Sequence, residues 1–237
     1  TVGSTKKIYA SPSPFTSLSD VTGVTVSGGN DWQFVNFNNK LIGAREGNTM
    51  VVYTGSSNFA AISAASGTVP DGNTVHSAFG RLWAQKADVA PSGLQLPIIP
   101  ASSFDKYLVA FLRNSIVVYN NPHDPSNLAI EQVIQGTGCI ARDSIQQVGN
   151  DLYFLSANGL RSLKQVLFSA DKIELTELSL SVRRELIEDI TGSGNLSTVK
   201  SNYDPEEGEY WLKSPSGKVW VFDLHNVKPE EKAALRV

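Results

Sequence analysis

Apolar residues in this chain gather in short runs that do not alternate with polar ones. Residues 108–119 read LVAFLRNSIVVY, an apolar run, a polar turn and a second apolar run. A strand with one face in water alternates apolar and polar side chains, because successive side chains point to opposite faces. The pattern therefore predicts antiparallel hairpins that are covered on both faces.

The same hairpin pattern recurs along the chain. Matching stretches are LIGAREGNTMVVY at 41–53, LVAFLRNSIVVY at 108–119, LYFLSANGLRSL at 152–163 and YWLKSPSGKVWVF at 210–222. Their turns contain Gly, Asn or Ser, which tolerate hairpin backbone angles. Another candidate strand precedes each hairpin, so the repeat unit is a meander of at least three antiparallel strands.

A fifth, weaker copy, VHSAFGRLWAQK, covers residues 75–86. Its partner strand is not recognisable in the following ADVAPSGLQLP, and the step to the next copy is short. Regular propeller blades repeat at about 40–50 residues. The short step suggests that a strand and a loop are absent near residues 86–98.

These meanders predict an all-β fold, a β-propeller of antiparallel meander blades with short inserted helices. A propeller blade has a neighbour against each face, which removes the alternation expected of a half-wet sheet. Residues 31–223 would form the propeller-like domain, after an irregular lead-in at 1–30. A β-sandwich or barrel core is the alternative, because both also contain meanders of short strands.

Two segments break the β pattern. LSVRRELIEDI, at 180–190, places Val182, Leu186, Ile187 and Ile190 on one helical face, with Ser181 as a candidate N-cap. We expect a helical insertion between blades there. The C-terminal tail, 224–237, contains Pro229 followed by good helix formers and predicts another short helix.

Composition narrows the possible partners. The chain has 237 residues, of which 41% are hydrophobic and 18% charged, and a formal net charge of -3. Lys and Arg are scattered, so no basic stripe indicates binding to a duplex. No apolar run is long enough for a membrane helix, and the first residues lack the apolar stretch of a signal peptide, so we expect no membrane anchor. Cys139 is the single cysteine, which excludes an internal disulfide.

The sequence does not predict a catalytic, cofactor-binding or metal site, and we expect no enzyme. His76, His123 and His225 have no ligands at metal-binding spacing, and Cys139 has no nucleophile signature around it, so we expect Cys139 to be a small buried residue. The remaining candidates are acidic, and we expect ordinary solvated or turn residues at each: Glu188, Asp189, Glu206, Glu207, Glu209 and, in the loop NNPHDPSN, Asp124.

Four long stretches carry a resemblance to a known family. They are FDKYLVAFLRNSIVVYNN, IEQVIQGTGCIARDSIQQVGNDLYFLSANGLRSL, ELSLSVRRELIEDI and SNYDPEEGEYWLKSPSGKVWVFDL. Their succession resembles the tail nozzle and tail tubular B proteins of short-tailed bacteriophages, including the DNA-stabilisation proteins of their tails. The resemblance covers about residues 30–223, and family members are considerably longer.

The resemblance implies a structural role. It implies a homo-oligomer, a hexameric nozzle ring at the distal end of the phage tail, that retains genomic DNA and then conducts it during ejection. The DNA would pass through the channel without sequence-specific binding. The ring would contact a tail adaptor or portal-side protein and tail fibres. The protein would be part of the virion and would be assembled in the host cytoplasm.

A monomeric β-propeller recognition module, binding a glycan or protein receptor, is the alternative function. Such a module predicts an exposed aromatic cluster at one end of the channel. The candidates are the four tryptophans, Trp32, Trp83, Trp211 and Trp220. Three of them lie inside predicted strands, where core packing is the competing role.

Overall fold

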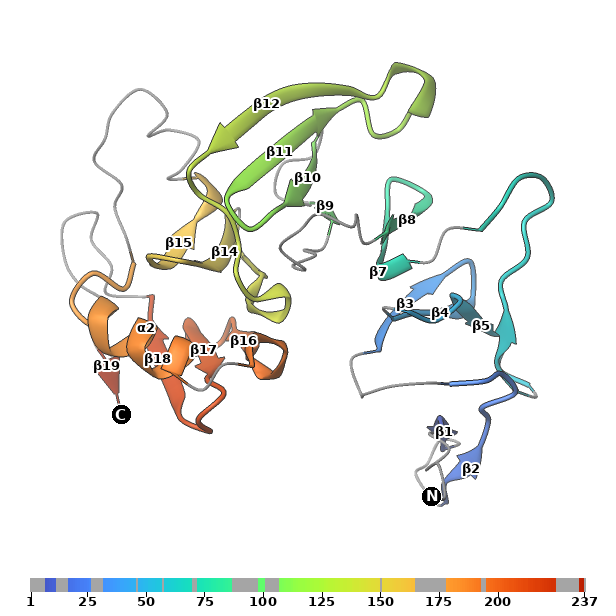
Figure 1. Ribbon diagram of the computed structural model, residues 1–237, viewed down its shortest axis with the longest axis horizontal. Coiled ribbons are helices and arrows are strands. Elements are labelled where there is room, and N and C mark those ends of the chain that lie inside the picture. Colours follow the sequence, from blue (N-terminus) through green and yellow to red (C-terminus); the bar gives the residue numbers. More distant parts are fainter. Residues whose placement is uncertain are drawn as a thin grey trace. The chain divides into compact units, whose positions relative to one another are not determined.

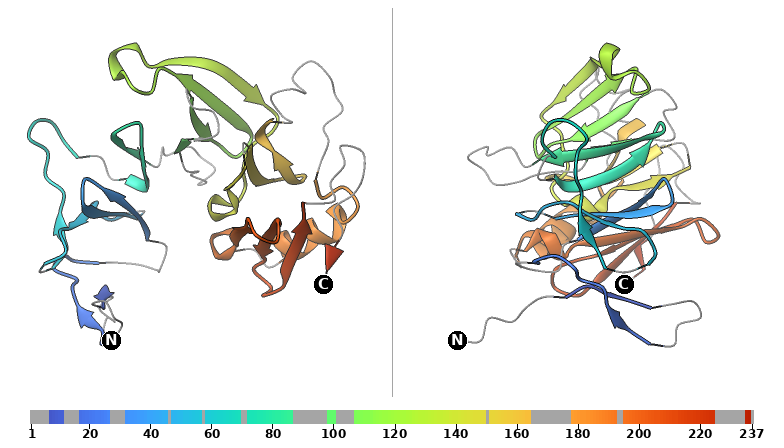
Figure 2. Two further views of the ribbon diagram at one scale, coloured as in Figure 1. Left: turned by 180° about the vertical axis from the view of Figure 1, so that it is seen from behind. Right: turned by 90° about the vertical axis from the view of Figure 1, so that its right-hand side faces the viewer.

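The computed structural model describes residues 7–11, 17–26, 32–45, 47–56, 58–69, 72–86, 98–100, 107–149, 151–164, 178–192, 195–224 and 235–236. The chain divides into two compact units, Thr1–Ile98 and Ile99–Val237. Both are built from antiparallel sheets of short strands, as Figures 1 and 2 show. The predicted all-β class is therefore confirmed.

In the first unit, the described strands form three antiparallel sheets. A small hairpin pairs β1 with β2, a four-stranded meander has the order β3-β4-β5-β6, and a second hairpin pairs β7 with β8. Their bounds are β1 Tyr9–Ala10, β2 Ser19–Asp20, β3 Gln33–Phe37, β4 Lys40–Ala44, β5 Val51–Tyr53, β6 Ala60–Ala61, β7 Gly72–Ala78 and β8 Arg81–Lys86.

The meander β3–β6 is covered on both faces. Ile42 and Ala44 belong to a core cluster with Val75 from β7. The neighbouring residue Leu41 and the β5 residue Val51 belong instead to a cluster that packs against residues of the β1–β2 region. Since side chains alternate between the faces of a strand, these two clusters lie on opposite sides of the sheet. This double cover explains the missing alternation in residues 41–53.

In the second unit, the described sheets follow one another in chain order. Their strand orders are β12-β11-β10-β9, β13-β14-β15 and β16-β17-β18-β19. The bounds are β9 Ile98–Pro100, β10 Leu108–Phe111, β11 Ser115–Asn120, β12 Ala129–Gln135, β13 Gln146–Val148, β14 Asp151–Ser156, β15 Gly159–Ser162, β16 Lys200–Asp204, β17 Glu209–Lys213, β18 Val219–Asp223 and β19 Leu235–Arg236. Short 3-10 helices lie at η1 Pro125–Asn127, η2 Arg142–Ser144 and η3 Leu196–Thr198.

The middle sheet of this unit, β13–β15, also has a neighbour on each face. Phe154 contacts Phe111 from β10, with ring centroids 5.0 Å apart. The adjacent residue Tyr153 points to the other face and lies 6.2 Å, ring to ring, from Tyr210 of β17. The Tyr210 hydroxyl donates a hydrogen bond to the Ser144 carbonyl at 2.5 Å, so the contact between these sheets is polar as well as apolar.

The predicted helical insertion forms helix α2, Arg183–Gly192. Leu186 and Ile190 are fully buried against the sheet core, as the helical periodicity predicts. On the same side, Asp189 accepts a hydrogen bond of 2.8 Å from the Trp220 indole nitrogen. The predicted N-cap is wrong by one residue, because the helix begins at Arg183 and its first backbone hydrogen bond is accepted by the carbonyl of Val182.

Two expectations about the chain ends need correction. The lead-in at 1–30 is not wholly irregular, because β1 and β2 pair within it. In the tail, Leu235 and Arg236 form strand β19 and pair with Phe222 and Val221, where a helix was expected. A free strand edge offers backbone hydrogen bonds that override helix propensity. The rest of the predicted tail helix, and residues 87–97 with their expected missing strand, lie outside the described residues.

Replacing Phe154 by alanine tests the stacking of sheets in the second unit. The side chain is fully buried between the β9–β12 and β13–β15 sheets. Loss of its burial and the resulting cavity should lower the free energy of unfolding by about 3–5 kcal/mol. Urea denaturation followed by circular dichroism measures this change.

The matched control is Val219→Ala on β18, where the side chain is 46% exposed. This change should cost less than about 1 kcal/mol. Equal losses for the two variants would contradict the assignment of Phe154 to a contact between sheets.

Candidate functional site

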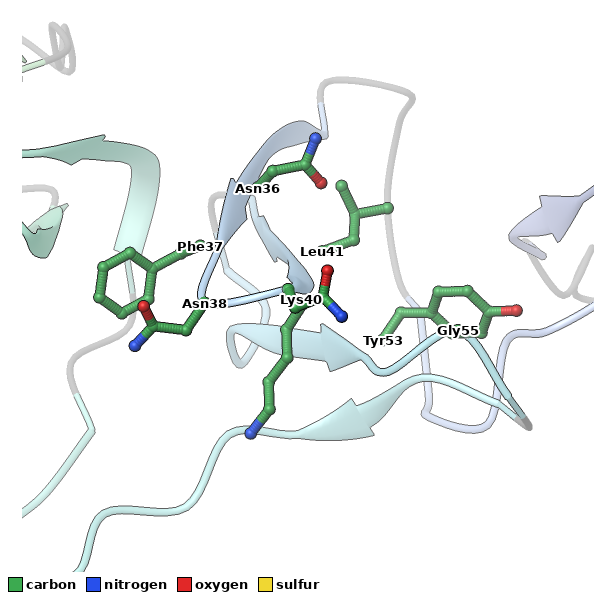
Figure 3. A pocket seen from close by; sticks show the side chains of 8 residues that line it. Asn36, Phe37, Asn38, Lys40, Leu41, Tyr53 and Gly55 are labelled. Atoms are coloured by element: carbon green, nitrogen blue, oxygen red, sulfur yellow. The ribbon is translucent and has the colours of Figure 1, made fainter.

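A hollow of about 510 Å³ lies at the turn between β3 and β4 (Figure 3). The turn residues Asn38 and Asn39 both have positive φ angles, 47° and 60°. Consecutive positive φ angles belong to a tight hairpin turn, which asparagine tolerates better than most residues. The turn fixes a register in which Asn36, Leu41 and Tyr53 form one row across three strands. Figure 3 shows Asn36 and Leu41 extending side by side from this row.

A chain of aromatic rings lies on the same face of the sheet. Trp32 stacks on Phe34 with ring centroids 5.9 Å apart, and Phe34 lies 5.9 Å from Phe59. Phe59 in turn stacks on Tyr53 at 5.1 Å. Phe59 is buried, whereas Phe34 is 40% exposed. The aromatic row, Trp32, Phe34, Phe59 and Tyr53, therefore runs from a buried anchor to a surface that a ligand can reach.

Gly43 explains how Phe34 lies flat over the sheet. The two residues are directly paired across β3 and β4. A Cβ atom at position 43 would lie 2.6 Å from Cε1 of Phe34 and 3.0 Å from Cγ2 of Val51. The ring thus occupies the space above a glycine that has no side chain of its own, an arrangement that also shields the glycine backbone.

The amides around the hollow have unused hydrogen-bonding capacity. Within the described ranges, the side chains of Asn36, Asn38, Asn39 and Lys40 make no hydrogen bond or ion pair with the protein. An asparagine amide offers two donor hydrogens and an acceptor oxygen. These groups are available to water or to a polar ligand.

A second hollow, of about 350 Å³, lies in the loop NNPHDPSN, which contains Asp124. Here Asp124 accepts hydrogen bonds from the Ser126 backbone at 3.0 Å and from Asn127 Nδ2 at 2.6 Å. Asn121 donates to the carbonyl of Asn127 at 3.3 Å. The polar groups of this loop satisfy one another, which agrees with the expected plain turn.

A polar junction ties η2 to β16. Asp143 accepts hydrogen bonds from Arg142 and from the Lys200 ammonium group. Burial of Asp143 would raise the pKa of its carboxyl group, but the hydrogen bonds from Arg142 and Lys200 outweigh it and hold that pKa below its ordinary value. Ser201 completes the junction by donating to the Asp143 carbonyl at 2.7 Å. These bonds connect η2, which precedes β13, to the first strand of the β16–β19 sheet. The charges of the junction are engaged with one another.

The residues considered as possible sites in the sequence are scattered. His76 lies half-buried on β7, where burial lowers its pKa; His123 lines the second hollow; and His225 is outside the described residues. In the described ranges, no group of three His, Cys, Asp or Glu side chains could hold a metal ion. Cys139 is fully buried as predicted, and burial raises the pKa of its thiol to about 11.

The acidic candidates have structural partners or lie in a turn. Glu188 pairs with Arg184 one helical turn away, and Glu209 accepts a hydrogen bond of 2.9 Å from the Trp211 indole. Asp189 accepts a hydrogen bond from the Trp220 indole nitrogen. Glu206 and Glu207 lie in the turn between β16 and β17.

The four tryptophans have different environments. Trp32 belongs to the aromatic row, and Trp83 on β8 is half-buried and donates to the Ala78 carbonyl at 3.2 Å. In the second unit, Trp220 is buried in the core, whereas Trp211 is 43% exposed on the other face of its sheet. Only the surroundings of Trp32 resemble the expected aromatic cluster. The signal for it in the sequence is the alternation in WQF, which places Trp32 and Phe34 on one face.

Comparison with known proteins finds no family profile that matches the chain and no significant match among curated proteins. Among the described residues, no helix has the length and apolar character needed to span a membrane.

Replacing Gly43 by alanine should displace the Phe34 ring. The added methyl group would overlap the ring edge and press on Val51, at a cost of about 1–3 kcal/mol. We expect an altered near-ultraviolet circular dichroism spectrum, because the Trp32–Phe34 stack changes, with an unchanged far-ultraviolet spectrum. Gly192→Ala is the control, since nothing lies within 4 Å of a Cβ atom there. An unchanged near-ultraviolet spectrum in Gly43→Ala would refute this packing.

Cys139 should make stability depend on alkaline pH. Its thiol has an ordinary pKa of 9.0, and burial raises this pKa to about 11 in the folded protein. The unfolded chain loses the proton first, so the free energy of unfolding should fall as the pH rises from 9.0 towards 11 and should not change for this reason at lower pH. Urea midpoints measured across this range test the effect. Cys139→Ala should make the slope shallower, and an identical slope would count against a buried thiol.

Proposed function

We propose that the stacked sheets are blades of a β-propeller and that the protein is a structural component of a short-tailed phage tail. The observation that carries the propeller is the double cover of the sheets β3–β6 and β13–β15 by sheets that precede and follow them in the chain. A two-layer sandwich leaves one face of each sheet in water, whereas blades cover each other on both faces.

The resemblance to tail nozzle proteins supplies the biological role. Its motifs coincide with the packed elements of the second unit: IVVY lies on β11, DLYFLS on β14, and the final YWL and VWVFD on β17 and β18. The proposed particle is a hexameric ring in the virion, assembled in the host cytoplasm, that contacts an adaptor or portal-side protein and the tail fibres. The role is structural and includes no catalytic step.

A nozzle must let DNA pass without gripping it. Affinity for phosphates comes from clustered cations that are free to displace counterions. Several cations of the described chain are instead paired with carboxylates: Lys7 with Asp20, Arg142 and Lys200 with Asp143, Arg184 with Glu188, and Lys218 with Asp189. Together with the net charge of -3, this pairing supports passage of DNA without sequence-specific binding.

The mass of the purified protein in solution tests the ring. A hexamer should give about six times the chain mass of 25.6 kDa by light scattering, with ring-shaped particles in negative-stain images. Antibodies to the protein should also label phage tails. A monomeric mass together with absence from virions would contradict the proposal.

A monomeric recognition module that binds a glycan or protein receptor is the second candidate. The partly exposed aromatic row beside the hollow of β3–β5 favours it. This function requires a particle with the mass of a single chain, so the same measurement separates the two candidates.

A further inference from the structure

We propose that the hollow at the β3–β4 turn, with the aromatic row beside it, binds a neutral saccharide. The site lies within one unit of the chain and depends on neither ring assembly nor closure of a propeller. It would serve a tail component as well as a monomeric receptor-binding protein. It rests on the glycan-binding candidate above and names the ligand class and the residues that would hold it.

The apolar part of the site matches the face of a sugar ring. A pyranose presents a face of C–H bonds that packs against the face of an aromatic ring. Phe34 is 40% exposed and rests on Gly43, between the stacked ring of Trp32 and the buried Phe59. Its neighbours hold the ring in place before any ligand binds, which lowers the entropic cost of binding.

The polar part of the site lies one cross-strand row further along. Asn36 follows Phe34 on the same face of β3, and Leu41 and Tyr53 continue its row across the sheet. A sugar hydroxyl both donates and accepts hydrogen bonds, as does an asparagine amide. Because Asn36 and Asn39 make no side-chain bonds to the described protein, a saccharide can engage them without breaking an existing contact. A few polar groups beside an aromatic surface are typical of small-ligand sites.

The charge of the lining favours a neutral ligand. It contains one cation, Lys40, and no carboxylate. Lys40 is paired with Phe37, so both side chains belong to the face opposite Asn36 and Leu41, and Figure 3 shows Lys40 extending away from those residues. A phosphate would require several donors and no acceptors, whereas every asparagine here brings an acceptor oxygen.

The loop around Asp124 is a useful contrast. Its hollow is also lined by asparagines, but Asp124, Asn121 and Asn127 bond to one another, and its described lining includes no Phe, Tyr or Trp. Amides in a hollow are therefore not sufficient evidence for a site. The combination of unengaged amides with the partly exposed Phe34 ring distinguishes the turn at β3–β4.

A printed glycan array probed with the labelled full chain tests the proposal first. We expect binding to at least one neutral glycan, confirmed by calorimetric titration with the same glycan in solution. Phe34→Ala and Asn36→Ala should each weaken binding about tenfold. Asn36 is exposed and makes no side-chain bond to the described protein, so its variant should keep the melting temperature of the wild type even if Phe34→Ala unfolds.

Matched controls come from the second unit. Trp211→Ala and Asn202→Ala remove an exposed aromatic ring and an exposed amide that are cross-strand neighbours on β17 and β16. Both variants should bind the glycan like the wild type. The proposal is overturned if no glycan on the array binds, or if the control variants lose as much affinity as Asn36→Ala.

Discussion

Face-to-face burial of short antiparallel sheets is the interaction on which this structure depends. A hairpin alone is marginal in water, and several of these strands contain only a few residues. The β3–β6 and β13–β15 sheets gain stability because side chains on both of their faces leave water. The β17–β18 hairpin differs from the predicted double cover, because its Trp211 and Val219 side chains are exposed. Leu41 and Ile42 are consecutive, yet they belong to different core clusters on opposite sides of one sheet. Phe154 and Tyr153 divide in the same way on β14. Positions that would face solvent in a sheet with one exposed face therefore carry apolar side chains in these two sheets.

This constraint explains what could be predicted from the sequence. The four strongest hairpins correspond to β4–β5, β10–β11, β14–β15 and β17–β18, because paired apolar runs and their turn residues are local signals. Helix α2 was equally readable from the spacing of Leu186 and Ile190. The partners of these elements were not local. Strand β19 consists of two residues, Leu235 and Arg236, whose conformation is set by pairing with the edge of β18 and not by their own side chains. The bulge of β12 opposite Val118 and Tyr119 likewise has no signature in AIEQVIQ.

At the candidate site too, the sequence predicts local features but not which residues meet in the fold. Trp32 and Phe34 could be assigned to one face of a strand from their spacing alone. Their meeting with Phe59 and Tyr53 depends on the folding of β5 and on the segment around Val21, whose carbonyl accepts a hydrogen bond of 2.8 Å from the Phe59 amide. Gly43 has no side chain to suggest a role, and its importance appears only when Phe34 is seen lying above it. The sequence offered Trp32 as one of four candidate tryptophans and gave no sign of the rings beside it.

A protein built by stacking sheets must also control where stacking stops. On β16–β18 the exposed face is arranged in rows across the strands. The middle row contains Asn202 and the apolar residues Trp211 and Val221. A basic row, Lys200 and Lys213, lies on one side of it. An acidic row, Asp204, Glu209 and Asp223, lies on the other side. Glu209 additionally holds the Trp211 indole by a hydrogen bond. Charged rows of opposite sign on either side of an apolar strip disfavour stacking against an arbitrary sheet, since burying unmatched charges is costly. A surface that packs on this face must therefore present basic groups to the acidic row and acidic groups to the basic row. This requirement makes the contact selective for particular partners.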